Sequence, residues 1–366
     1  MRNKKVAIIG GGIIGLMLAS RLAEYNIETT IFERKKNIDD EADKASGILS
    51  VEGLKKISLP YDNAIINGFR GADFFIKDIR FEVYSKKTKA YLLDRKKLAV
   101  ECMKFANEKG VDIRLNSGIK KEDIRNLSKE YEVIVGADGA LSDTAETFEF
   151  PRIKKYLLTY KTEYEINEEV DSSKVNIYLD TRKNGFFGWI APHNKNRIEV
   201  GIGVESNKNI SSKIAFNNFT KKIEDILKDS HKLKEYASII PIERREITVK
   251  GNILLVGDAA GQVKASTGGG IVYGVLCSYV AADKIREHFE HRSTLMEYEN
   301  AWRKRFGLDF AANSLLHNYY VNSSDFAFDH FIKLLKAIGM EKVLGKYGDM
   351  DSPIQTIKNI IARKSY

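Results

Sequence analysis

The sequence predicts an α/β fold with an added antiparallel β region and a helical C-terminal part. Three observations support this prediction. Residues 6–34 give an apolar strand, a glycine-rich turn, a helical pattern and a second strand. Residues 149–205 are β in character and poor in helix formers, whereas the chain from about Arg292 is helical and rich in Phe, Tyr and Lys. Because 366 residues exceed the usual size of a single hydrophobic core, two domains are expected.

The glycine-rich turn has the spacing G-x-G-x-x-G at Gly10, Gly12 and Gly15. In units that bind dinucleotides, these glycines permit a tight turn, a close approach of the backbone to the pyrophosphate, and close packing of helix on strand. The helix N-terminus offers N–H groups to the phosphates. The second strand ends at Glu33, 18 residues after Gly15, where a carboxylate can bind an adenosine ribose. A glycine-rich turn without a ligand is the alternative, but the register of strand, helix and acidic residue favours dinucleotide binding.

Two later apolar strands also run into a turn with glycine and aspartate. The strand 133–135 leads to Asp138, and the segment 252–256 leads to Asp258. A glycine cluster at 268–270 then opens a long helix. The other expected elements are strands at 72–76, 80–84, 111–115, 186–191 and 198–204, and helices at 51–57, 96–109, 210–230 and 271–289.

The composition is that of a soluble globular protein, with 43% hydrophobic and 30% charged residues. No apolar run reaches membrane-span length, and the N-terminus enters a core strand directly rather than through a signal peptide. The net charge of +9 suits either a solvated surface or attraction to acidic lipid headgroups. Because Lys and Arg are scattered, nucleic-acid binding is not expected. Only Cys102 and Cys277 are present, which excludes a disulfide framework and an iron–sulfur centre and points to the cytoplasm or the cytoplasmic face of a membrane.

Two segments carry a specific resemblance: residues 257–274, GDAAGQVKASTGGGIVYG, and residues 187–193, FGWIAPH. The chain resembles the geranylgeranyl reductase family of FAD-dependent oxidoreductases, which has the aromatic-hydroxylase fold, and within it the archaeal digeranylgeranylglycerophospholipid reductases. The first segment is similar to the family's Gly-Asp segment over its whole length. The second fits the family's Y-x-W-x-F-P-K motif at Trp189 and Pro192. The resemblance covers roughly residues 1–290.

This resemblance implies a discontinuous, Rossmann-type FAD-binding domain with an inserted antiparallel β domain for substrate. The expected boundaries are 1–58, 88–147 and 245–290 for the FAD-binding domain, 59–87 and 148–244 for the substrate domain, and 291–366 for the helical C-terminal region.

The resemblance also implies residue roles. Glu33 would bind the adenosine ribose, Arg95 the region of the diphosphate, and Asp258 the ribityl chain and pyrophosphate region, while the backbone N–H groups of Gly270 and Ile271 would face the isoalloxazine edge. The full set of expected FAD contacts is Gly10, Gly12, Ile14, Gly15, Glu33, Arg34, Lys44, Ala45, Gly47, Arg95, Gly118, Ile119, Asp138, Gly139, Asp258, Gly269, Gly270 and Ile271. The expected substrate contacts are Phe187, Trp189 and Pro192. No metal site is expected.

The implied reaction is saturation of isolated C=C bonds in a geranylgeranyl or other isoprenoid chain, by hydride from reduced flavin and a proton. Candidate proton donors are Ser46, His193 and Tyr160, of which His193 is expected in an exposed hairpin turn. The family's cysteine beside the flavin is absent, since Ala45 or Ser46 occupies its position. A second G-x-G-x-x-G is also absent, so electrons would come from ferredoxin or a transient NAD(P)H.

Two alternatives stay open at this point. The first is a flavin-dependent monooxygenase or halogenase of the same fold, acting on an aromatic or lipid substrate. The second is a non-catalytic flavoprotein that binds prenyl lipids, which the missing cysteine supports. For the leading interpretation, a nearly insoluble substrate implies peripheral contact with a membrane.

Overall fold

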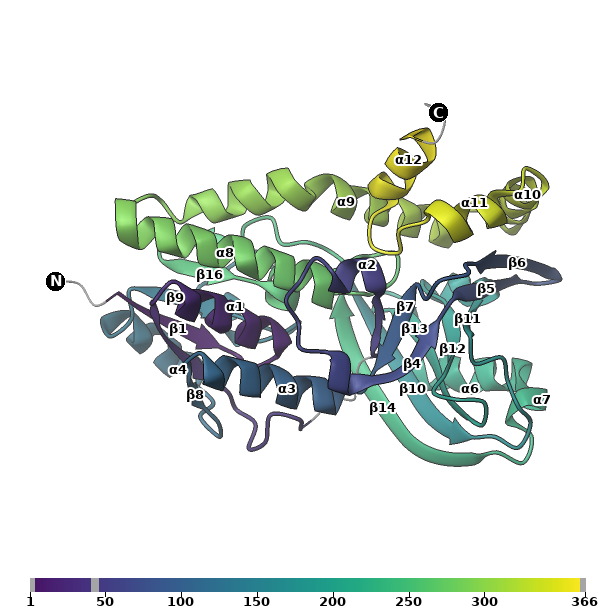
Figure 1. Ribbon diagram of the computed structural model, residues 1–366, viewed down its shortest axis with the longest axis horizontal. Coiled ribbons are helices and arrows are strands. Elements are labelled where there is room, and N and C mark those ends of the chain that lie inside the picture. Colours follow the sequence, from purple (N-terminus) through teal and green to yellow (C-terminus); the bar gives the residue numbers. More distant parts are fainter. Residues whose placement is uncertain (1–3, 41–45, 363–366) are drawn as a thin grey trace.

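Three β-sheets and a group of C-terminal helices make up the protein (Figure 1). The computed structural model describes residues 4–40 and 46–362. A six-stranded sheet is ordered β15-β16-β9-β1-β2-β8, a seven-stranded sheet β14-β10-β13-β12-β11-β5-β6, and a three-stranded sheet β3-β7-β4. The predicted combination of an α/β unit, a largely antiparallel β region and a helical C-terminal part is therefore confirmed.

The six-stranded sheet is parallel except for β15, which pairs with β16 in the antiparallel sense. Alternate side chains of β1 enter different cores: Val6 and Ile8 face α1 and α8, while Ala7 and Ile9 face the opposite side of the sheet. Burial on both faces explains the nearly continuous apolar runs of these strands. The strands are β1 Lys5–Ile9, β2 Glu28–Phe32, β8 Asp112–Arg114, β9 Val133–Gly136, β15 Val249–Lys250 and β16 Ile253–Leu255.

Helices α1, α3 and α8 contribute to the core on one face of this sheet. The start of α3 is fixed by Asp94, whose carboxylate accepts hydrogen bonds from the backbone N–H groups of Lys96 and Lys97 at 3.0 Å. The helices are α1 Ile13–Glu24, α2 Val51–Leu54, α3 Arg95–Glu108, α4 Lys121–Ile124, α5 Asp143–Thr147 and α8 Ile271–His291. The order of elements shows that the chain leaves the six-stranded sheet after β2 and after β9; the domain boundaries stay a prediction.

The seven-stranded sheet contains the predicted hairpin as β12 and β13, paired in the antiparallel sense. The single helix predicted at 210–230 is wrong: the structure has α6 Ser212–Lys222 and a short α7 Glu224–Leu227. Ile223 separates them with φ −120° and ψ 25°, outside the helical region. The strands of the two remaining sheets are β3 Ile48–Ser50, β4 Ile65–Phe69, β5 Gly71–Ile76, β6 Ile79–Tyr84, β7 Ala90–Leu93, β10 Tyr156–Glu165, β11 Lys174–Tyr178, β12 Gly188–Pro192, β13 Arg197–Glu205 and β14 His231–Pro241.

Four helices follow α8 along one edge of the molecule: α9 Met296–Asn322, α10 Asp325–Ala337, α11 Met340–Tyr347 and α12 Pro353–Ala362 (Figure 1). Tyr298 and Trp302 of α9 are fully buried against the core of the six-stranded sheet. Helix α11 lies on β6 so closely that a Cβ on Gly345 would come within 2.0 Å of the Tyr84 carbonyl oxygen. In the described residues, each helix is too short or too polar to cross a membrane.

Candidate active site

The predicted dinucleotide turn lies at the carboxyl end of β1 and leaves no room for a side chain at Gly10 or Gly15. Gly10 has φ +107°, and a Cβ there would be 2.4 Å from the Ala137 carbonyl oxygen. A Cβ on Gly15 would be 2.1 Å from the carbonyl oxygen of Gly10. Gly12, by contrast, faces open space and precedes α1 with no side chain capping it. The N-terminus of α1 is therefore open to a phosphate group.

Glu33 is buried at the end of β2, directly across from this turn. Its Oε2 accepts a hydrogen bond from the backbone N–H of Gly11 at 2.6 Å, and its Oε1 accepts one from Lys35 at 2.9 Å. Gly118 lies beside the same strand end, because a Cβ on it would be 3.0 Å from Cβ of Arg34. The structure thus brings together the residues predicted to contact the adenosine half of FAD.

Asp258 and the glycine cluster meet at the start of α8. A Cβ on Gly270 would lie 3.0 Å from Oδ1 of Asp258. The protein atoms around Asp258 shield its carboxyl from water and raise its pKa to about 6. The positive charge of the nearby Arg95 opposes this shift. Ile14, at the start of α1, packs on Gly257 and Gly274. Segments far apart in sequence therefore converge on one edge of the six-stranded sheet.

Asp138 and Gly47, two other predicted cofactor contacts, also stabilise the local structure. Asp138 accepts hydrogen bonds from Ser142 Oγ and from the backbone N–H and Oγ1 of Thr144, at 2.5–2.9 Å, and so fixes the first turn of α5. Its burial raises the pKa of its carboxyl. Gly47 is buried where a Cβ would be 2.0 Å from the Leu93 carbonyl oxygen. The predicted contacts Lys44 and Ala45 lie outside the described residues.

The residues described here fit FAD. The open helix N-terminus suits a diphosphate, the glycine turn excludes side chains from its place, and the carboxylates at Glu33 and Asp258 are hydrogen-bond acceptors for sugar and ribityl hydroxyls. Arg95, close to Asp258, adds a positive charge for the phosphates. Such a bound group would lie along the carboxyl ends of β1, β2, β9 and β16, where parallel α/β sheets bind ligands.

The predicted substrate residues lie on the facing part of the seven-stranded sheet. Trp189 is buried over Gly201, and its Nε1–H donates to Oε1 of Glu199 at 2.9 Å. The Phe187 ring lies edge-on to Trp189 with centroids 6.3 Å apart. Pro192 is buried at the end of β12, and its carbonyl oxygen accepts a hydrogen bond from Asn67 at 2.9 Å. Phe187 and Trp189 pack with Phe69, Ala90 and Leu92 of the three-stranded sheet into a stiff apolar wall.

The sequence prediction missed a buried ion pair beside this wall. Nζ of Lys161 lies 2.6 Å from Oε2 of Glu199, and the two side chains are only 5% and 2% exposed. Burial alone would oppose ionisation of Glu199, but the Lys161 charge and the hydrogen bonds from Lys161 and Trp189 outweigh it and lower the pKa of Glu199. Glu199, inside the apolar run 198–204, was the available signal; Lys161 did not stand out, because β10 also contains Glu163 and Glu165.

A cavity of about 400 Å³ lies between part of the predicted FAD site and the seven-stranded sheet. The predicted substrate residues Phe187, Trp189 and Pro192 do not line it; Trp189 is connected to it through its hydrogen bond to Glu199. One side includes Gly47, Leu93, Asp94 and Arg95, next to the predicted FAD site. The other side comes from the seven-stranded sheet and is mainly charged; it includes Lys161, Glu163, His193, Arg197, Glu199 and Lys234. The geometry therefore places a space for substrate between a cofactor site and the sheet.

The three candidate proton donors differ in position. Ser46 precedes Gly47, and its buried Oγ has no hydrogen-bond partner among the described residues. His193 was expected to be exposed, which is wrong: it is half-buried in the cavity wall, where burial lowers the pKa of its imidazole. Tyr160 packs against Phe216 on the α6 side of the sheet, and its hydroxyl donates to Glu235. Burial raises the pKa of Tyr160 to about 12.

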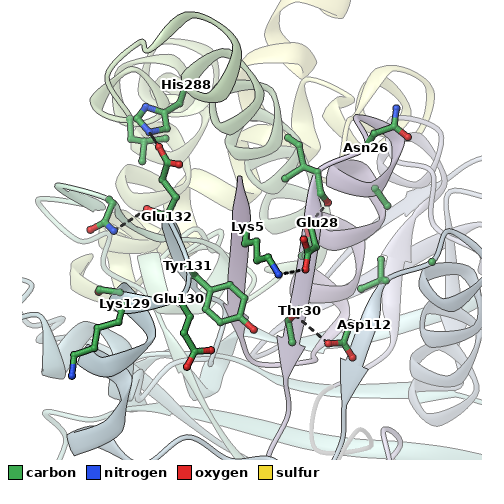
Figure 2. A pocket seen from close by; sticks show the side chains of 18 of the residues that line it. Lys5, Asn26, Glu28, Thr30, Asp112, Lys129, Glu130, Tyr131, Glu132 and His288 are labelled. Carbon is green, nitrogen blue, oxygen red and sulfur yellow. Dashed lines mark hydrogen bonds and ion pairs between the residues drawn. The ribbon is translucent and has the colours of Figure 1, made fainter. Parts of the chain in front are cut away.

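A larger cavity, of about 1380 Å³, lies at the opposite edge of the six-stranded sheet (Figure 2). Lys5, Glu28 and Asp112, at the amino ends of their strands, line it. Lys5 and Glu28, neighbours on β1 and β2, form an ion pair at 2.6 Å in its lining. None of the predicted FAD contacts that the structure describes lines this cavity, and α/β sheets bind ligands at the carboxyl ends of their strands, so it is not the candidate site.

Comparison with known proteins agrees with this geometry. Residues 5–57 match the family model of pyridine nucleotide-disulphide oxidoreductases. A protein of Methanocaldococcus jannaschii, whose name assigns no function, is 28% identical over 94% of this chain and 92% of its own. Digeranylgeranylglycerophospholipid reductase 2 of Methanopyrus kandleri is 26% identical over 98% of this chain and 96% of its own.

Solved structures share the fold over the whole chain. A geranylgeranyl bacteriochlorophyll reductase-like protein from Thermoplasma acidophilum has a TM-score of 0.82 at 19% identity, covering 98% of this chain and 96% of the other. The flavin-dependent brominase Bmp2, as a triple mutant, has a TM-score of 0.69 at 14% identity, covering 98% and 99%. The resemblance to the geranylgeranyl reductases that the sequence motifs indicated is therefore confirmed over nearly the full length of the chain.

Proposed function

We propose that the protein is an FAD-dependent reductase that saturates isolated C=C bonds in isoprenoid chains of membrane lipids or their precursors. The observation that carries this proposal is the cavity that extends from Asp94 and Arg95 to Glu199, the hydrogen-bond partner of Trp189. The names of the reductases to which the chain is similar supply the substrate class.

The chain's own task is to position an alkene and to exclude water. When bound, reduced FAD supplies a hydride to one alkene carbon. An isolated alkene offers no oxyanion to stabilise, so the reaction depends on holding the bond at the cofactor in a dry site. Trp189 and Phe187 would support that site from behind as a rigid apolar layer, with Trp189 bonded to Glu199 in the cavity lining. The N-terminus of α8, at Gly270 and Ile271, favours negative charge on the cofactor.

The second alkene carbon needs a proton. Ser46 has a buried hydroxyl with no hydrogen-bond partner among the described residues, beside the cavity, and His193 lies in the cavity wall. Because the pKa of His193 is lowered, its imidazole is neutral at pH 7 and accepts a proton before it donates one. We assign Ser46 and His193 as carriers of this proton. Tyr160 is less suited, since its hydroxyl faces the other side of the sheet.

The partners follow from the same proposal. A prenyl lipid is the substrate, and NAD(P)H or ferredoxin is the electron donor. The protein works in the cytoplasm, peripherally on the membrane that contains its substrate, and binds no nucleic acid.

Anaerobic turnover tests the proposed function. The dithionite-reduced holoprotein is mixed with geranylgeranyl lipids, and the products are measured by mass spectrometry. A gain of H₂ for each saturated bond, with reoxidation of the flavin, is expected. Oxygen-dependent insertion of an oxygen or halogen atom would favour the monooxygenase alternative. FAD and lipid binding without turnover would favour a non-catalytic flavoprotein.

Replacing Trp189 with Phe should change substrate handling and leave FAD in place. The smaller ring keeps an apolar wall but loses the hydrogen bond to Glu199. We expect a folded, yellow variant whose flavin is reduced normally but whose reoxidation by prenyl substrate is slowed or yields partly saturated products. Stopped-flow absorbance and product analysis measure both effects. Wild-type turnover with unchanged products, or loss of FAD together with the fold, would show that Trp189 only packs in the core and does not act on the substrate.

Replacing Glu33 with Ala should weaken FAD binding by about 1–3 kcal/mol, the scale of a charge-assisted hydrogen bond. The carboxylate fixes the glycine turn through Gly11 and offers an acceptor at the end of β2. Titration of the apoprotein with FAD, followed by flavin fluorescence, gives the dissociation constant. Glu28→Ala is the matched control, because Glu28 lies at the other end of the same strand. Equal affinities for the two variants would show that Glu33 has no role in binding.

A further inference from the structure

The C-terminal helices expose many large apolar side chains. Large side chains of residues 308–362 point to solvent, among them Leu308 (75% exposed), Leu315 (69%), Phe326 (73%), Leu334 (59%) and Ile361 (60%). We call the exposed apolar and basic side chains of residues 308–362 the C-terminal face. Figure 1 shows α9 to α12 along one edge of the molecule, outside the three sheets.

These helices are apolar on the inner side as well. Helix α10 buries Phe328 and Ile332 while it exposes Phe326 and Leu334. The ring of Tyr319, near the end of α9, lies 5.2 Å from that of Phe331, so the exposed groups of the two helices are continuous. A helix that is apolar on both sides is usually covered on both. The C-terminal face therefore indicates a contact with something apolar.

The charges of this segment are divided between its two sides. Exposed lysines on the C-terminal face are Lys333, Lys342, Lys346 and Lys358, whereas the ammonium of Lys336 donates to the Arg80 carbonyl of β6. The acidic side chains of residues 308–362 are all buried or half-buried, and each has a partner. Asp329 pairs with Lys77 at 2.8 Å, Asp325 with Arg182 at 2.5 Å, and Asp351 with Lys264 at 2.6 Å. The outward charge is therefore positive.

We propose that the C-terminal face docks on the surface of an anionic lipid bilayer. Apolar side chains would enter the headgroup region while the lysines meet lipid phosphates, as amphipathic helices do at membrane interfaces. The combination of apolar and exclusively basic outward groups favours this occupant over a second copy of the chain, whose identical face would bring lysines together. The inference rests on the proposed function, because docking gives access to a substrate that resides in the bilayer.

Vesicle sedimentation with the FAD-loaded protein tests this docking. Vesicles of phosphatidylcholine alone are compared with vesicles containing phosphatidylglycerol. Binding should be stronger to the anionic vesicles and should fall with added salt. Lys333→Gln with Lys342→Gln should reduce anionic binding by about fivefold for each lysine. Phe326→Ser with Leu334→Ser should weaken binding to the anionic vesicles at least tenfold. The loss should be the same at low and high salt, because salt does not screen an apolar contact.

Matched controls separate this face from the rest of the surface. Leu141→Ser changes a leucine that is 68% exposed outside the C-terminal helices, and Lys221→Gln changes an exposed lysine on α6. Both should bind vesicles as the wild type does. Unchanged binding by the C-terminal variants, or equal binding by all variants and controls, would overturn the proposal. Sedimentation velocity that shows a dimer dissociated by Phe326→Ser, without vesicle binding, would assign the face to a second copy instead.

Turnover of detergent-dispersed substrate separates a failure of membrane docking from a failure of the proposed reductase activity. The lysine and the Phe326/Leu334 variants should saturate detergent-dispersed substrate at the wild-type rate. They should lose activity only toward substrate in vesicles. Vesicle binding through this face by a wild-type protein that saturates no lipid would refute the proposed reaction and leave the docking surface in place.

Discussion

Replacing Asp351 with alanine should lower the free energy of unfolding by about 3–5 kcal/mol, the range for breaking a buried ion pair. Asp351 and Lys264 lie 2.6 Å apart with side chains that are each 4% exposed. Without the carboxylate, the Lys264 ammonium keeps, among the described residues, the Met350 carbonyl oxygen at 3.3 Å. Urea unfolding followed by circular dichroism measures the loss.

The same variant should also weaken FAD binding. Lys264 belongs to the loop that opens α8, where its backbone N–H donates to the Gly269 carbonyl at 3.1 Å and its carbonyl accepts from Gly268 at 2.8 Å. The control is the double variant Asp351→Ala with Lys264→Met, which removes both charges and should recover most of the lost stability. A single variant that loses less than about 1 kcal/mol would show that the pair does not stabilise the fold.

Replacing Lys161 with methionine should cost a similar amount, about 3–5 kcal/mol at neutral pH. Glu199 would stay buried with the Trp189 N–H but without its lysine. The surface pair Lys195–Glu169, whose side chains are 65% and 61% exposed, supplies the control: Lys195→Met should cost less than about 1 kcal/mol. Denaturant unfolding of the two variants gives the comparison.

The cost of Lys161→Met should depend on pH. In the wild type, Lys161 lowers the pKa of Glu199 below its unfolded value, so this pair stabilises the fold above that value and loses its effect as the pH falls through the folded pKa. In the variant, burial without lysine raises the pKa of Glu199, and protonation relieves the unpaired charge. The difference between the two proteins should therefore shrink from pH 7 toward pH 4. A difference that does not change with pH would contradict this assignment.

Local patterns in the sequence were sufficient for much of the fold. The glycine spacing at 10–15 predicted a turn that the structure explains by backbone approaches of 2.1 and 2.4 Å, which only glycine permits. The two runs at 186–191 and 198–204, on either side of the polar residues 193–196, predicted the β12–β13 hairpin, and the segment 257–274 predicted the Gly-Asp turn and α8. These features depend on residues close together in the chain. The roles assigned to individual FAD and substrate contacts stay predictions.

The errors have a common physical cause. His193 was expected in solvent, but the cavity wall around it comes from strands distant in sequence. The helix predicted at 210–230 has a continuous apolar pattern, yet the backbone at Ile223 leaves the helical region and the chain enters β14 at His231. Periodicity reports which side chains are apolar and carries no information on where the chain must turn to join a sheet.

The sequence by itself determined the dinucleotide turn, the type of most elements and the likeness to a reductase family, because each depends on steric demands or motifs within a short stretch. The tertiary structure alone decided which charges pair and which apolar side chains face outward. Glu199 meets Lys161 across neighbouring strands, and Asp351 meets Lys264 across 87 residues of chain. Such contacts depend on the path of the whole backbone, which brings distant residues within hydrogen-bonding distance and leaves the C-terminal face uncovered.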